Sequence, residues 1–254
     1  MKKDLQVLLA RYADRYETPA FLEDDPSRFM HQVDGAENKE AVAFVASCLS
    51  FGNRVQFCRK IQWLLDWSGG DMDGWIRSGA FERDVGPDAS TCFYRFFTFE
   101  TMNSFLRAYR RLMEEHGTLG GFVRKEARGD GLLAVKAICG YFASHGLGAV
   151  VPKDAHSACK RVCMFLRWMV RSGSPVDIGL WSDFIDRRTL VVPLDTHVVQ
   201  EACRLGLLKG RCASMCAARR LTAALAEAFP DDPCRGDFAL FGYGVDRAYG
   251  KGAS

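Results

Sequence analysis

The sequence predicts an all-α protein, because apolar residues recur at helical spacing and strand patterns are scarce. Between Met102 and Met113 the apolar side chains fall at positions i, i+3, i+4, i+7, i+10 and i+11, which lie on one face of a helix. The chain has only five isoleucines, and runs that alternate apolar and polar residues are rare. Glycine, proline, serine and aspartate gather in short stretches between the periodic segments, as is typical of loops.

The same periodicity places each expected helix along the chain. In chain order the expected helices cover residues 5–16, 42–49, 54–67, 102–113, 131–144, 157–171, 197–205 and 214–229. The least regular region is about 68–92, where one group of helices gives way to another. A single all-α domain over residues 1–254 is therefore expected. This domain could consist of two lobes that flank a cleft. One lobe would comprise about residues 1–90 with the C-terminal end, and the other about residues 91–215.

Composition narrows the class of protein without naming a function. The 254 residues are 48% hydrophobic and 26% charged, as in ordinary soluble proteins, and the net charge of +3 is too small to show a nucleic-acid partner. Ten cysteines without regular spacing suit a reducing compartment, and neither a secretory signal nor a membrane span is recognisable. We expect a cytoplasmic monomer with no cofactor, no structural metal and no membrane partner.

Asp195 stands out because it ends an apolar run directly before an expected helix, in "LVVPLDTHVVQ". Asp and Thr favour the position before a helix, where their oxygens accept unpaired backbone N–H groups. Asp195 and Thr196 therefore fit a helix start, with Thr196 as a capping residue. Taken alone, this structural interpretation is favoured. A carboxylate fixed by packed neighbours also suits catalysis.

Lys160 breaks a local preference, because cations are unfavourable in the first turn of a helix. In "KRVCMFLRWMVR" the apolar residues share one face, and Lys160 lies on the opposite face with Arg167 and Arg171. Departures of this kind concentrate at functional sites. A solvated basic face is the ordinary alternative.

Together these two stretches resemble the helix-hairpin-helix DNA glycosylase superfamily. The likeness covers about residues 150–245: a helix with an early lysine, then "PLDTHV" at the head of another helix, and "DFALFGYG" further on. The 35 residues from Lys160 to Asp195 are most like the archaeal 8-oxoguanine glycosylase branch, and the whole C-terminal part is also similar to a related uncharacterised bacterial family. The glycine-rich hairpin of the superfamily reads here as "VVPKDAHSAC", without its glycines.

The resemblance implies a DNA repair glycosylase with AP lyase activity, acting on duplex DNA that holds a damaged base such as 8-oxoguanine. Lys160 would be the nucleophile that forms a Schiff base, and Asp195 the catalytic carboxylate. Because a solvated lysine is mostly protonated at neutral pH, such a nucleophile should face Asp195 across the substrate rather than form a tight ion pair. Phosphate contacts are expected from Lys153, Arg161, Arg167 and Arg171.

Other functions stay open. Arg54 and Arg95 either touch phosphate or pair with carboxylates, and the pairing is favoured. A non-catalytic nucleic-acid binder with a glycosylase-like fold agrees with the missing hairpin glycines. A helical protein with no nucleic-acid role agrees with the small net charge.

Overall fold

The computed structural model describes residues 1–152 and 157–248, and nearly all of the regular structure in these residues is helical. This confirms the all-α class. The sheet within these residues is a single antiparallel hairpin of β1 (Cys92–Tyr94) and β2 (Phe97–Thr98). Each helix in the described ranges is too short or too polar to cross a lipid bilayer.

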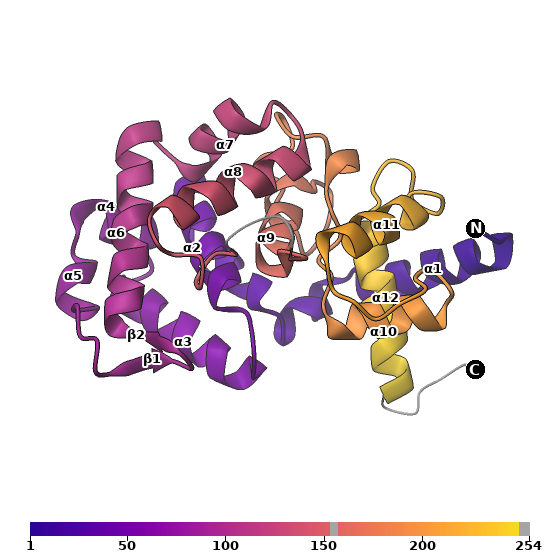
Figure 1. Cartoon of the computed structure of the whole chain (residues 1–254), viewed down its shortest axis with the longest axis horizontal. Helices are drawn as coiled ribbons and strands as arrows, with labels where there is room; N and C mark the ends of the chain where they lie inside the picture. The colour runs from indigo at the N-terminus through magenta and orange to yellow at the C-terminus, as the bar shows by residue number, and fades with distance from the viewer. Residues whose placement is uncertain (153–156, 249–254) are drawn as a thin grey trace.

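One group of helices comes from the first part of the chain (Figure 1). It consists of α2 (Ala36–Leu49), α3 (Arg54–Trp67), α4 (Met72–Ser78), α5 (Phe81–Asp84), α6 (Phe99–His116), α7 (Leu119–Ala127) and α8 (Gly131–Ser144). Helix α2 is buried from residue 40 to 49 and carries Phe44, whose ring contacts four other aromatic rings at the centre of the core. This aromatic centre excludes water and fixes the group as one packed body.

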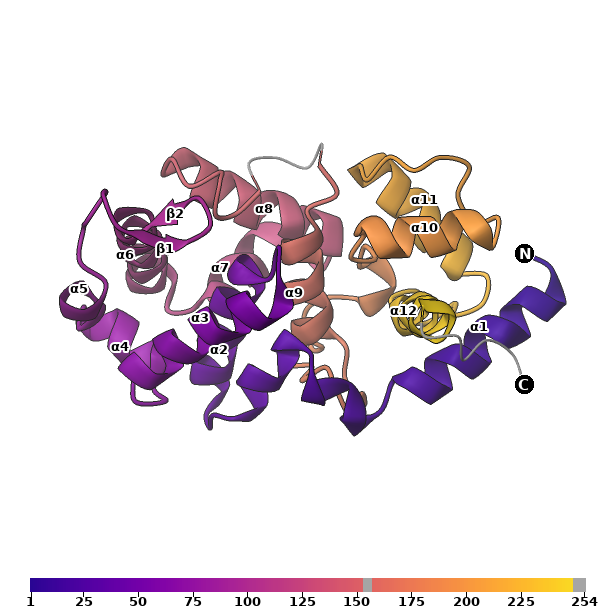
Figure 2. The same cartoon turned by 90° about the horizontal axis from the view of Figure 1, so that it is seen from below.

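A second group joins segments that are far apart in the sequence. It consists of α1 (Lys3–Tyr16), α10 (Thr196–Arg204), α11 (Met215–Leu225) and α12 (Arg235–Ala248). Helix α12 packs against both α1 and α10 (Figure 2). Gly242 allows the close approach of α1, because a Cβ atom there would lie 2.1 Å from the ring of Tyr16. Two short 3-10 helices, η1 (Pro19–Glu23) and η2 (Pro26–His31), lead from α1 to α2, and η3 (Arg187–Thr189) precedes α10.

Helix α9 (Lys160–Val170) lies between the two groups (Figures 1 and 2). It packs against α2 and α8 on one side, and every residue from Val162 to Val170 is buried. The boundary between lobes expected near residue 90 does not separate these two groups. Helix α4 lies before that position and α6 after it, and the two pack against each other. The chain instead passes from the first group to the second after α9.

The eight helices expected from periodicity are present. The spans 54–67 and 131–144 match α3 and α8 from end to end. Helices α4, α5, α7 and α12, the 3-10 helices and the hairpin are additional to those eight expected spans. Helix α4 begins inside a stretch expected to be a loop, because Asp71 caps it: its Oδ1 accepts a hydrogen bond from the N–H of Gly74 at 3.0 Å.

Candidate functional site

Lys160 and Asp195 meet in space. Lys160 is the first residue of α9 and Asp195 directly precedes α10, and the Nζ–Oδ2 distance is 3.8 Å. Each side chain is 35% exposed. The separation is longer than that of a hydrogen-bonded ion pair, so the two groups face each other without a tight contact. The expectation that the two groups open on one place agrees with this distance, but a salt bridge of 3.8 Å leaves no room for a substrate between them.

Asp195 is held by its role as the N-cap of α10. Its Oδ1 accepts a hydrogen bond from the N–H of Val198 at 2.9 Å, which leaves Oδ2 on the side of Lys160. The expectation that Thr196 is the cap is wrong, because Thr196 is already the first residue of the helix. The preceding run, residues 190–194, is buried and anchors the carboxylate. The cap and the candidate catalytic group are the same residue.

Both side chains line a large pocket of about 950 Å³. Its walls come from the end of α1, from η1, and from α9, α10 and α12, and Arg54 at the start of α3 borders it as well. Phe21, Phe238 and Phe241 contribute an aromatic surface, with ring centroids 5.0–5.1 Å from Phe21 to the other two. The pocket therefore combines an amine, carboxylates and flat apolar rings, and its size falls in the range of small-molecule sites.

Asp237 is a third charged group of this pocket, and its importance was not expected from the sequence. It lies in the first turn of α12, is 8% exposed and accepts a hydrogen bond from Arg167. Burial raises the pKa of Asp237 to about 6, Arg167 opposes that rise, and the nearby Asp195 adds to it. The available signal was an aspartate beside the apolar run Phe238–Leu240, much as Asp195 follows one.

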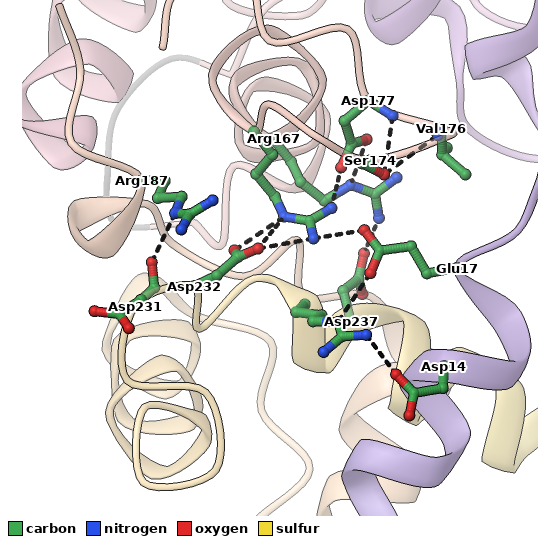
Figure 3. A network of polar contacts seen from close by, with 12 residues as sticks. Asp14, Glu17, Arg167, Ser174, Val176, Asp177, Arg187, Asp231, Asp232 and Asp237 are labelled. Carbon is green, nitrogen blue, oxygen red and sulfur yellow. Dashed lines mark hydrogen bonds and ion pairs between the residues drawn. The ribbon is translucent and has the colours of Figure 1, made fainter. Parts of the chain in front are cut away.

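Arg167 and Arg171 do not form an exposed basic stripe. Their side chains are 3–4% exposed and belong to a network of charges between α9, α1 and the start of α12 (Figure 3). Arg167 pairs with two aspartates and Arg171 with three acidic residues; the acidic partners are Glu17, Asp177, Asp232 and Asp237. The expectation that these arginines bind DNA is wrong for this structure. The face of α9 that carries Lys160, Met164 and Arg167 borders the pocket, and carboxylates enclose the two arginines there.

The other expected phosphate contacts have different surroundings. The guanidinium of Arg161 donates hydrogen bonds to the carbonyl of Cys48 at 2.8 Å and of Ala149 at 3.3 Å, so part of its donor set is engaged within the protein. Arg54 and Arg95 are exposed, and no carboxylate pairs with either within the described part of the chain. The favoured pairing is therefore not observed for them. Lys153 lies outside the described residues.

Metal ligands do not gather at this pocket. Across residues 1–152 and 157–248, no group of three or more His, Cys, Asp or Glu side chains is placed to hold a metal ion. Lys160 can act as a nucleophile once it is deprotonated, and Asp195 and Asp237 can stabilise positive charge or exchange protons.

Comparison with known proteins gives one match, to a family model. The model described as a protein of unknown function (DUF2400) matches residues 25–246, which include Lys160, Asp195 and Asp237. No curated protein and no solved structure matches the chain. Because the match covers most of the sequence, the chain belongs to this family of proteins of unknown function.

Proposed function

We propose that the protein is a DNA glycosylase with lyase activity, which takes a nucleotide out of duplex DNA and removes its base with Lys160. The observation that carries the proposal is the meeting of Lys160 and Asp195 at one pocket, although 35 residues separate them in the sequence. An enzyme that acts on a base must move the nucleotide out of the stack and into such a pocket. A glycosylase-like fold, with the pocket as the cleft between two lobes, is part of the same proposal.

The lysine and the aspartate divide the chemistry. The free amine of Lys160 forms a bond to C1′ of the sugar, while the bond from C1′ to the base nitrogen breaks and the base leaves with that electron pair and a proton. The sugar ring then opens to give a Schiff base, and loss of a C2′ proton expels the 3′ phosphate. Asp195, as a carboxylate, stabilises the positive charge that develops on the sugar; it then takes up the proton that the lysine nitrogen loses after it bonds to C1′, and this proton leaves with the base.

The rest of the pocket suits a base. Phe21 and Phe241 offer faces or edges for stacking, which tolerates any base. Arg167 holds one oxygen of Asp237, Oδ2, so that Oδ1 is available to accept a hydrogen bond from a base N–H group. Among damaged bases, 8-oxoguanine is the one that the sequence resemblance suggests.

Borohydride trapping tests the proposal. Reduction of the Schiff base should link the wild-type protein to duplex DNA that holds 8-oxoguanine or an abasic site, and Lys160→Gln should abolish the link. Asp195→Asn should slow base release and leave folding intact, because asparagine is also a good N-cap. Lys209→Gln is the matched control, since Lys209 is an exposed lysine that does not line the pocket. Trapping by Lys160→Gln at the wild-type rate would reject the assignment.

The salt bridge itself favours a second candidate. A lysine that stays an ammonium beside Asp195 has no free electron pair, so a protein that binds damaged DNA without turnover also fits the geometry. Tight, salt-dependent binding of the abasic duplex without any trapping by the wild type would select this function. Absence of both binding and trapping would reject a nucleic-acid role.

A further inference from the structure

Arginines from the second group of helices also line the pocket. They are Arg15 of α1, Arg204 of α10 and Arg247 of α12. Their side chains are 51%, 45% and 39% exposed, so the guanidinium groups reach solvent at the border of the pocket. Arg15 is fixed by the buried Asp246, with 2.8 Å between Nη1 and Oδ2. The Schiff-base chemistry proposed above leaves these arginines without a role.

A buried carboxylate holds the other two arginines. The side chain of Glu201 is 9% exposed, and its Oε1 accepts a hydrogen bond from Nη1 of Arg204. Its Oε2 lies 3.8 Å from Nη1 of Arg247. Gly244 of α12 permits this placement, because a Cβ atom there would lie 3.1 Å from Cγ of Glu201. The packing of α10 against α12 therefore sets both guanidinium groups in place.

Compensation of the buried carboxylate does not account for both arginines. A buried carboxylate that serves only the fold is expected to have both oxygens hydrogen-bonded. Within the described residues, Oε2 of Glu201 is buried and has no hydrogen-bond partner, because Arg247 lies beyond hydrogen-bonding distance. Arg247 therefore keeps donors that Glu201 does not use. Two guanidinium groups share one carboxylate, and this surplus of positive charge suits an anion.

We propose that Arg204 and Arg247, held by Glu201, form a phosphate subsite of the pocket. The forked donors of a guanidinium match phosphate oxygens, and arginines that are already fixed lose less side-chain freedom on binding. Arg204 lies nine residues after Asp195, a rise of about 13 Å along α10. The subsite therefore holds a phosphate further along the strand, not the 3′ phosphate that is attached to the reacting sugar. The inference rests on the proposed function for the source of this phosphate.

Salt-dependent binding of DNA tests the subsite. The probe is a labelled duplex with a tetrahydrofuran abasic analogue, followed by fluorescence anisotropy over a range of KCl concentrations. The double variant Arg204→Gln/Arg247→Gln should bind roughly ten-fold more weakly at low salt. The slope of log K against log salt concentration should become shallower by about 0.9, the value for one lost phosphate contact. Arg107→Gln is the matched control, because Arg107 pairs with Glu82 at the surface, is 56% exposed and does not line the pocket.

A variant that keeps the charge separates binding from folding. Arg204→Lys/Arg247→Lys retains two cations beside Glu201 but loses the forked donors. Its salt slope should equal that of the wild type, while its affinity should be several-fold weaker. If the glutamine variant does not fold, the lysine variant decides: the weaker affinity supports the subsite, and wild-type affinity rejects it.

A free nucleotide is the other source of a phosphate group, and calorimetry with 2′-deoxyguanosine 5′-monophosphate tests it. If the wild type binds this nucleotide, the glutamine variant does not, and the duplex slope is unchanged, the subsite stands and its phosphate comes from a free nucleotide. If removal of both arginines changes the binding of neither ligand while Lys160 still traps DNA, the subsite is overturned and the proposed function stands. If the wild type binds neither ligand, both fall together.

Discussion

Replacement of Arg167 by methionine should strongly destabilise the protein, because it removes the positive charge from a buried group of carboxylates. The Arg167 side chain is 4% exposed, and the side chains of its partners Asp177 and Asp237 are 0% and 11% exposed. Methionine fills much of the same volume, so the main loss is electrostatic. Asp177 keeps its contact with Arg171, whereas Asp237 loses the arginine that donates to it. Breaking a buried pair from one side costs about 3–5 kcal/mol.

The loss should depend on pH, and the pKa of Asp237 gives its direction. Burial raises this pKa to about 6 from the ordinary aspartate value of 3.8, so the folded state binds a proton more readily than the unfolded chain does. The stability linked to this group is therefore present at low pH and is lost as the pH rises through about 6. Removing Arg167 raises the pKa further. Near pH ~5 the carboxyl is protonated in the variant and the arginine matters less, so the destabilisation should be smaller than near pH ~8.

Urea unfolding of wild type and Arg167→Met at about pH 8 and about pH 5 measures both effects. Arg124→Met is the matched control, because Arg124 pairs with Asp183 on the surface, where both side chains are more than half exposed. Surface pairs of this kind contribute at most about 1 kcal/mol. If Arg167→Met unfolds within about 1 kcal/mol of the control at both pH values, the network does not stabilise the fold as argued.

Two further predictions concern the packing and the buried charge of the fold. Burial raises the pKa of Glu40 to about 7, although hydrogen bonds from Trp181, Gly120 and Leu119 act to lower it. The protonated Glu40 therefore stabilises the fold at low pH, and this stabilisation should be lost as the pH rises from about 4.5 to about 7. Glu40→Gln should reduce the change of the unfolding free energy over this pH range by about 2–3 kcal/mol, as measured by thermal or urea unfolding. An unchanged pH dependence would contradict the raised pKa of Glu40. Gly242→Ala should destabilise the fold by about 1–3 kcal/mol through the clash with Tyr16, which thermal unfolding would detect. Gly140→Ala, in a helix position where a Cβ meets no other atom, should be neutral or stabilising, and equal melting shifts for the two glycines would reject the packing argument.

Local patterns predicted eight of the helices and placed Lys160 and Asp195 at helix starts, because those features depend on neighbours in the sequence. Apolar spacing places α3 and α8, and an aspartate before an apolar–periodic segment marks the start of α10. The orientation of α9 was not predictable in this way. A polar stripe on a helix looks the same whether it faces water or acidic groups from distant helices, so Arg167 was expected at the surface and lies in the interior. Asp237 was missed for the same reason, since its environment is made by α9 and α10 rather than by its own segment.

The pocket has walls from both α1 and α12, and this has a consequence for synthesis of the protein. More than 200 residues separate Tyr16 from Phe241, yet both line the pocket and their rings lie 6.3 Å apart. During translation the first helix therefore waits, with its apolar face uncovered, until the last of the helices described leaves the ribosome. Lys160 and Asp195 are made earlier, but their pocket is incomplete until then. A nascent chain therefore carries Lys160 without the surroundings that the folded pocket gives it.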